Sequence, residues 1–207
     1  MRPTQFRHCA VPPFTFISPK CEVAIPVREA LLRYALQQAS LDPLVRTIRY
    51  RKALDIECPK VSLTGVVLNR VDGKNFLLKG CETRPKRSEE ELARLTYALG
   101  RYGLHLLERE SPDVKREPLF SNARQVWWRE RYDVPLIDRI KIGAALDEDG
   151  PQPIFELKKR ARPSCDILAA VCALACEDLV KLNIDDIRLG PRTMVCSGDR
   201  GHGVRGQ

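Results

Sequence analysis

The sequence lacks the features of a membrane or secreted protein. It contains no apolar run close to the roughly 20 residues that a membrane-spanning helix requires. Its first residues, MRPTQFRHCAVPPFTF, lack the continuous apolar segment of a signal peptide. The eight cysteines are scattered and include no C-x-x-C pair, so a disulfide framework is not expected. We therefore expect a cytoplasmic protein with no membrane partner.

Metal-binding and catalytic motifs are also scarce. The chain has three histidines, none of them near Cys172 and Cys176 in the sequence, so a tetrahedral zinc site is not expected at this cysteine pair. No G-x-S-x-G, H-E-x-x-H or G-x-x-x-x-G-K-[ST] motif is present. Cys81 and His105 could be drawn as a nucleophile and its base, but His105 falls in a predicted strand, which favours packing. These motifs give no reason to predict a cofactor.

What the sequence does have is an uneven distribution of positive charge. The net charge is +8, because residues 1–135 carry 24 basic and 16 acidic residues, whereas residues 136–207 carry 11 of each. Clustered cations neutralise phosphates without reading base sequence. We predict that two clusters bind DNA, with a solvated surface as the alternative: Arg46, Arg49, Arg51 and Lys52, and then Arg84, Lys86 and Arg87. A third cluster, around Arg124, Arg129 and Arg131, lies beside Trp127 and Trp128, which we expect in the core rather than stacked on bases.

The first part of the chain predicts a mixed α/β fold. Five prolines in residues 1–26 predict an irregular arm. Hydrophobic periodicity then predicts, in order, a helix over 27–40, strands over 47–58, 61–70 and 75–80, a helix over 88–103 and a strand over 104–109. Asp72-Gly73 joins two of these strands as a hairpin. The second helix begins with a capping box and should bury Leu92, Leu95, Leu99 and Tyr102. This order suits a mixed sheet with a crossover helix on its face.

The pattern changes after residue 135. Helices are predicted over 137–146, 154–160 and 164–180, and strands over 181–184 and 193–197. This is the element order of a winged helix. We therefore expect an irregular arm, a core, a winged helix and a flexible tail, over 1–26, 27–135, 136–196 and 197–207 respectively.

Several stretches of the sequence resemble the TnsA-like transposon endonuclease family. They are LDPLVRTIRYR, RVDGKNFLLKG, YGLHLLERE, REPLFSNARQVWWR and VPLIDRIKIGAALDEDGP. The resemblance extends over about residues 27–196. It implies an α/β restriction-endonuclease-like core, with a mixed sheet and flanking helices, followed by a small winged-helix domain.

The resemblance also implies a magnesium site that these residues do not supply. In the family, an acidic residue before the hairpin, a Glu-x-Lys pair on its second strand and a glutamate from the first helix gather the metal. Here the acidic position falls near Thr64 or Gly65, and the Glu-x-Lys positions fall on Lys79 and Cys81. A cation at residue 79 would repel the metal. Glu29 alone could stand for the glutamate of the helix.

More than one function fits these observations. The first is a nuclease-inactive, DNA-associated or scaffolding subunit of a mobile-element transposition system, which needs no cofactor. The second is an active magnesium-dependent endonuclease whose site has moved, with Glu29, Asp55, Glu57 and Glu82 as candidate ligands. The third is a regulator that binds DNA through its winged helix. A remnant without present activity also fits.

The last long helix predicts which partner the winged helix binds. A recognition helix carries Arg, Lys, Asn or Gln on its exposed face. SCDILAAVCALACEDLV has none of these, and its polar side chains are those of Ser164, Asp166, Glu177 and Asp178. Its apolar surface exceeds one buried stripe, so we predict that residues 136–196 bind another protein subunit, while DNA binds the N-terminal core.

Overall fold

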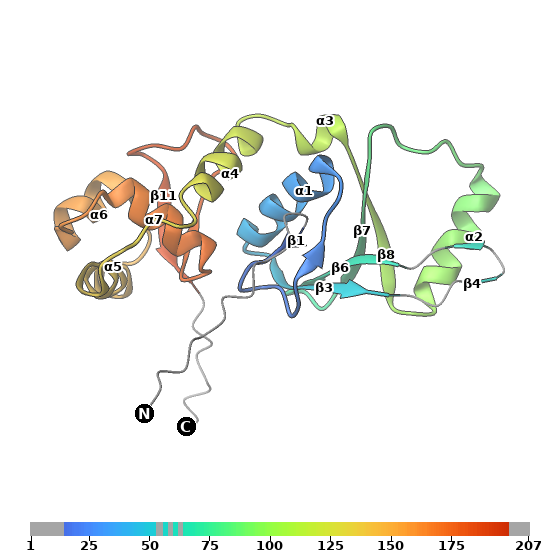
Figure 1. Ribbon diagram of the computed structural model, residues 1–207, viewed down its shortest axis with the longest axis horizontal. Helices are drawn as coiled ribbons and strands as arrows, with labels where there is room; N and C mark the ends of the chain where they lie inside the picture. The colour runs from blue at the N-terminus through green and yellow to red at the C-terminus, as the bar shows by residue number, and fades with distance from the viewer. Residues whose placement is uncertain (1–14, 53–55, 58–59, 62–63, 199–207) are drawn as a thin grey trace, which may run out of the picture.

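The computed structural model describes residues 15–52, 56–57, 60–61 and 64–198, with the backbone alone described at 56–57 and 60–61. Two groups of elements lie side by side along the long axis of the molecule, each around its own sheet (Figure 1). The fold is a mixed α/β fold, as the sequence predicts. Among the described residues, no helix has both the length and the apolar character needed to cross a membrane.

The larger sheet has the strand order β3-β6-β7-β8. The strands β3 (Val45–Arg51), β6 (Gly65–Arg70) and β7 (Asn75–Cys81) are antiparallel neighbours, and β8 (Leu104–Glu110) lies parallel to β7. The predicted hairpin is confirmed, with Gly73 at a φ of 80° and the Lys74 N–H donating to Asp72 Oδ1 over 3.1 Å. The predicted strand over 47–58 is wrong in extent. β3 ends at residue 51, and β4 (Ile56–Glu57) pairs separately with β5 (Lys60–Val61).

Two helices cover opposite faces of this sheet. Side chains alternate between the two faces along each strand, so neighbouring residues pack under different helices. Leu68 and Leu78 join the large core on the side of α1 (Ala30–Leu41), whereas Val67 and Leu77 pack beneath α2 (Glu89–Gly100). The predicted capping box of α2 is confirmed, and so is the burial of Leu95 and Leu99. The burial predicted for Leu92 and Tyr102 is wrong, with exposed fractions of 51% and 48%. The small core under α2 includes residues from the second half of the helix, whereas Leu92 lies near its start and Tyr102 lies beyond its end.

The second group contains α5 (Leu136–Asp149), α6 (Ile154–Ala161) and α7 (Ile167–Cys176), with a sheet in the order β10-β11-β9. The predicted strands appear as β10 (Val180–Leu182) and β11 (Met194–Ser197), but β9 (Gln152–Pro153) lies where neither a helix nor a strand was predicted. β9 pairs with β11, more than 40 residues away in the sequence. A strand of this length has no periodicity of its own that could have revealed it.

The start of α7 also differs from the prediction. The cap is Asp166, whose Oδ1 accepts hydrogen bonds from the N–H groups of Leu168 and Ala169. Ser164 instead donates its hydroxyl and its N–H to the buried carboxylate of Asp138 on α5. These bonds lower the pKa of Asp138 to about 2, and the bond from the Ser164 hydroxyl is the largest cause. The carboxylate therefore stays ionised and links α5 to the residues just before α7.

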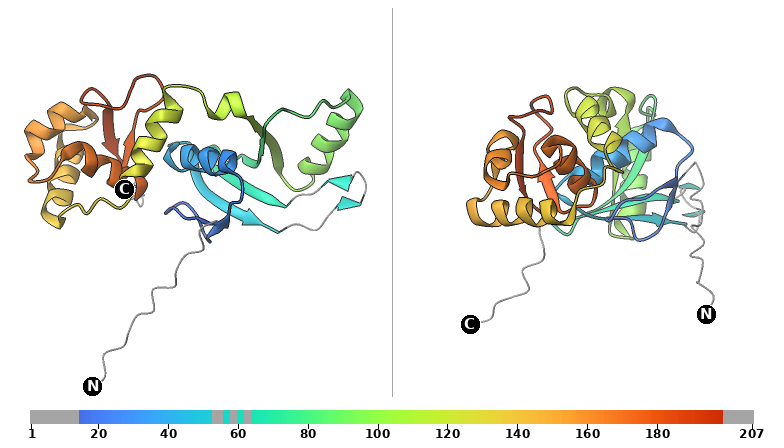
Figure 2. Two further views of the ribbon diagram at one scale, coloured as in Figure 1. Left: turned by 45° about the horizontal axis from the view of Figure 1, so that its top comes forward. Right: turned by 60° about the vertical axis from the view of Figure 1, so that its left-hand side comes forward.

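The helix α4 (Leu119–Trp128) joins the two groups and follows the short α3 (Ser111–Val114). It packs against α1 and against α7 (Figure 2). One hydrophobic core includes residues of all three helices. Every α7 residue is buried except Leu168, which is half-buried. The apolar surface that predicted a protein partner for α7 is therefore covered within the chain itself.

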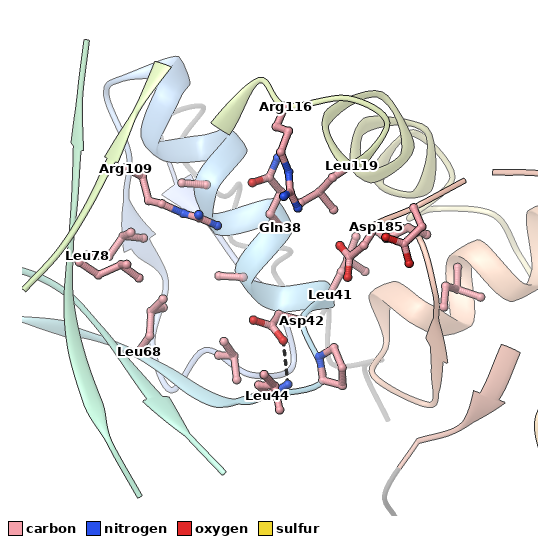
Figure 3. A pocket seen from close by; sticks show the side chains of 18 residues that line it. Gln38, Leu41, Asp42, Leu44, Leu68, Leu78, Arg109, Arg116, Leu119 and Asp185 are labelled. Atoms are coloured by element: carbon pink, nitrogen blue, oxygen red, sulfur yellow. Dashed lines mark hydrogen bonds between the residues drawn. The ribbon is translucent and has the colours of Figure 1, made fainter. Parts of the chain in front are cut away.

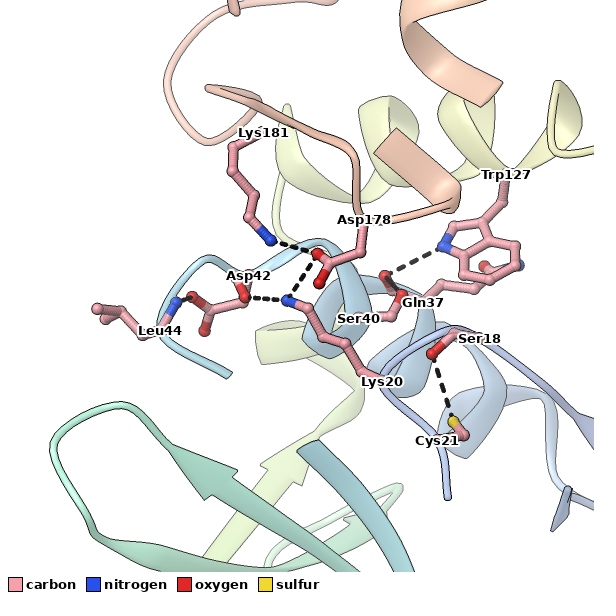
Figure 4. A network of polar contacts seen from close by, with 10 residues as sticks. All are labelled: Ser18, Lys20, Cys21, Gln37, Ser40, Asp42, Leu44, Trp127, Asp178 and Lys181. Atoms are coloured by element: carbon pink, nitrogen blue, oxygen red, sulfur yellow. Dashed lines mark hydrogen bonds and ion pairs between the residues drawn. The ribbon is translucent and has the colours of Figure 1, made fainter. Parts of the chain in front are cut away.

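The segment before α1 is ordered as well, which corrects the prediction of an irregular arm for the part that the structure covers. β1 (Thr15–Phe16) pairs with β2 (Ile25–Pro26). Between them, Lys20 is 4% exposed and donates to the Asp42 carbonyl over 2.7 Å, with Asp178 Oδ1 at 3.6 Å (Figure 4). Asp178 also pairs with Lys181. Burial is the largest cause that lowers the pKa of Lys20 to about 8. This network ties the N-terminal segment and the end of α1 to the second group.

Candidate nucleic-acid interface

One end of the larger sheet holds most of the residues that the sequence singled out. At this end lie the last residues of β3, β7 and β8 and the first residue of β6. The strand register shows this, since Arg51 is opposite Gly65 and Cys81 is opposite Glu110. We call this end of the sheet the open end. The strands diverge beyond it, with β3 and β6 leading toward β4 and β7 leading toward α2 (Figure 1).

Lys79 fills the position where the resemblance implies a metal. Its ammonium donates to the Thr64 carbonyl over 2.6 Å. A Cβ atom at Gly65 would lie 3.3 Å from Lys79 Nζ, so the amine stands directly in front of the expected acidic position. Burial lowers the pKa of Lys79. The amine therefore crosslinks β7 to the start of β6, and it occupies the space that metal ligands would need.

The carboxylates beside Lys79 are already paired with arginines. Glu108 accepts two hydrogen bonds from Arg87, at 2.8 and 2.6 Å, and this contact is the largest cause of the raised pKa of Arg87 and the lowered pKa of Glu108. Glu110 pairs with Arg84 at 3.1 Å. Burial first, and then Glu108 and Glu110, raise the pKa of the Cys81 thiol, which keeps it protonated at neutral pH.

A magnesium ion does not fit this set of groups. Magnesium needs free oxygen ligands, and the open end offers an ammonium, a protonated thiol and two carboxylates engaged with guanidinium groups. No group of three metal-ligating side chains occurs among the residues described. Lys79 shares its sheet face with Leu77 under α2, whereas Gly80 lies against α1 on the opposite face.

The structure describes the side chains of two of the four candidate ligands of a displaced metal site. Glu29 is exposed just before α1, and its side chain makes no capping bond. Glu82 is exposed in the segment after β7. Asp55 lies outside the described residues, and Glu57 is described by its backbone in β4 alone.

The predicted DNA-binding cations divide into paired and unpaired groups. Arg49 pairs with Glu22 at 2.6 Å, and Arg84 and Arg87 are held by the carboxylates of β8. The remaining four make no ion pair within the described part of the chain: Arg46, Arg51, Lys52 and Lys86. Arg46 lies at the far end of β3, roughly 16 Å from Arg51 at about 3.3 Å per residue. The other three are placed around the open end.

A cleft of ≈ 460 Å³ opens on the α1 face of the sheet (Figure 3). Arg109 from β8 and Arg116 extend their guanidinium groups toward Gln38 of α1, and Asp42 and Asp185 lie on the other side. Neither arginine side chain has an ion-pair partner in the described regions. These arginines could not be recognised from the sequence, because nothing local distinguishes an arginine that lines a cleft from one on an open surface.

The two tryptophans have opposite environments. Trp127 is 9% exposed, and the centre of its ring lies 5.1 Å from that of Phe16. Its indole N–H donates to the Gln37 carbonyl over 3.1 Å. Trp128, one position later on α4, is 88% exposed. The expectation of a core position is confirmed for Trp127 and wrong for Trp128, because adjacent helical residues point about 100° apart at 3.6 residues per turn.

The packing expected of Cys172 and Cys176 is confirmed, whereas the packing expected of His105 is wrong, because its side chain is exposed. Cys172 and Cys176 are buried in α7, where desolvation raises the pKa of Cys172 to about 12 and that of Cys176 further. His105 is exposed beside Phe76, five positions along β8 from the residue opposite Cys81, so no nucleophile–base pair forms.

Comparison with known proteins gives no further assignment, because no family model and no curated protein matches this chain.

Proposed function

We propose that this chain is a TnsA-like, nuclease-inactive subunit of a mobile-element transposition system, which holds DNA at the open end of its larger sheet. The order α1, β3, β6, β7, α2, β8, with one parallel pair at the end, supports a restriction-endonuclease-like core. The order α5, β9, α6, α7, β10, β11, with β9 added to the wing, supports a winged helix. Fold alone does not give function, so the proposal depends on the chemistry of the open end.

The contact between Lys79 and Thr64 is the observation that carries the proposal. It puts a positive charge where cleavage would need a divalent cation. The same charge is favourable for holding a phosphate backbone, as are Arg51, Lys52 and Lys86, which make no ion pair with the residues that the structure describes. The chemistry therefore supports binding of DNA without metal-dependent cleavage.

The described surface of the second group favours a protein contact over base reading. The helix α7 has no exposed polar face that could enter a major groove. In contrast, α5 exposes Leu136, Ile137 and Ile140 at 71%, 67% and 62%. Apolar side chains clustered in this way are typical of protein contacts. A scaffolding role for this group would therefore use α5 rather than α7.

Substituting glutamine at Arg51, Lys52 and Lys86 together should weaken duplex DNA binding and flatten its salt dependence. Each phosphate contact contributes about 0.9 to the slope of log affinity against log salt, so the slope should fall by roughly 2.7 in magnitude. Fluorescence anisotropy with a labelled duplex at several salt concentrations measures this slope.

A charge-matched control is available on α6, where Lys158, Lys159 and Arg160 can be replaced by glutamine in one variant. The control should keep the wild-type slope, because these cations belong to the other group of elements. Equal slopes in the two triple variants would contradict DNA binding at the open end.

A further inference from the structure

We infer that the hollow beside Trp128 binds an unstacked base of single-stranded nucleic acid, which would give the chain a second and chemically different DNA contact on α4. This inference rests on the proposed DNA-associated function and names a further site for it. The hollow measures ≈ 500 Å³ and is bordered by α1 and α4.

The first observation is the exposure of Trp128. Tryptophan is highly buried on average, but 88% of this side chain is accessible to solvent. An indole ring that faces solvent can stack on any base, because every base has a π face. The buried face of α4 is formed by Trp127 together with Asn122, Ala123 and Val126, so Trp128 takes no part in the core.

The second observation is a cluster in which the Arg124 guanidinium lies over two aromatic rings, of which Tyr34 borders the hollow and Phe120 packs against Tyr34. The Arg124 guanidinium lies 5.7 Å from the centre of the Tyr34 ring and 5.4 Å from that of Phe120. Tyr34 and Phe120 meet edge to face at 5.1 Å. Planar guanidinium groups held in this way stack on bases and attract phosphates.

The polar groups of the hollow fit a base edge and a phosphate better than an apolar protein surface. The carboxamide of Gln125 borders the hollow, and its side chain has no hydrogen-bond partner in the part of the chain that the structure describes. An amide of this kind can donate to and accept from a base edge. Among the charged side chains that border the hollow, Arg124 is basic and Glu130 is acidic, and Arg129 and Arg131 lie next to Glu130 in the sequence.

The geometry favours a single strand over a duplex. In a duplex the faces of the bases are covered by their neighbours, and a protein must pay unstacking energy to reach them. A single strand presents these faces directly, and aromatic residues beside basic groups are the usual way of holding it. Trp128 should therefore contribute to single-strand binding and not to duplex binding.

Fluorescence tests this inference directly, because the chain has two tryptophans and only Trp128 is exposed. Short oligothymidylate should quench the emission of the full-length wild-type protein, and the Trp128→Phe variant, with Trp127 as its remaining tryptophan, should lose the quenching. Trp128→Ala should weaken oligothymidylate binding by roughly 5- to 150-fold, the range for losing one stacked base. Trp128→Phe should retain most of the affinity.

Two controls separate this inference from the proposed function. Tyr97→Ala removes another exposed aromatic residue, 72% exposed on α2, and should leave oligothymidylate affinity unchanged. Duplex affinity should be unchanged in Trp128→Ala. If duplex binding is normal but Trp128→Ala binds oligothymidylate like the wild type, this inference is overturned and the proposed function stands. Failure to bind either form of DNA overturns both.

Discussion

Replacing Asn122 with alanine should lower the free energy of unfolding by roughly 3–5 kcal/mol, because several buried groups lose their partners at about 1–3 kcal/mol each. Asn122 is fully buried in α4. Its Nδ2 donates to the carbonyls of Ile184 and Ile187, at 2.8 and 2.7 Å, and its Oδ1 accepts from the N–H of Leu189 at 2.8 Å. One side chain thus satisfies the backbone of the loop that leads to β11.

Asn183→Ala is the matched control for this variant. Asn183 lies in the same loop, and its exposed Oδ1 accepts only a long bond of 3.4 Å from the Asp185 N–H among the bonds described. Its replacement should change stability by less than about 0.5 kcal/mol, as is usual for surface positions. Urea unfolding followed by circular dichroism measures both variants, and similar midpoints would show that Asn122 does not anchor the loop.

Replacing Trp127 with alanine should destabilise the chain by about 3–5 kcal/mol, the usual range for removing a buried aromatic side chain. The substitution removes the contact with Phe16 of β1, leaves the Gln37 carbonyl of α1 without the indole donor and opens a cavity where α4 packs on these elements. Because the shared core runs through this point, both groups of elements should lose stability together.

Trp128→Ala provides the control in the adjacent position. It removes a side chain of the same size from solvent, so its midpoint of unfolding should stay within about 0.5 kcal/mol of the wild type. Comparable destabilisation by the two alanine variants would contradict the assignment of Trp127 to the core and of Trp128 to the surface.

The sequence predicted those parts of the fold that depend on local pattern. Hydrophobic spacing predicted α1, α2, α5, α6 and α7, the Asp72-Gly73 turn predicted the hairpin, and Ser88 with Glu91 predicted the cap of α2. Each signal arises within a few residues of the chain. β9 and the packing of α7 against α4 were missed, because both depend on partners far away in the sequence.

In the candidate site, too, local features could be predicted from the sequence, whereas contacts between distant residues could not. The resemblance placed Lys79 and Cys81 at positions where it implies metal ligands. It could not show that Arg84 and Arg87 are held by Glu110 and Glu108, since those pairs form only when β8 lies beside β7. The sequence also could not separate Trp127 from Trp128, because the helix α4 that orients them was not predicted.

The most direct test of DNA binding without cleavage is to incubate the purified full-length chain with supercoiled plasmid and magnesium or manganese. Because Lys79 occupies the expected metal position, the plasmid should stay supercoiled at protein concentrations that retard it on a gel at low salt. Nicking that requires the metal and disappears in the Glu29→Ala or Glu57→Ala variant would contradict the proposal and show that the chain is an active nuclease.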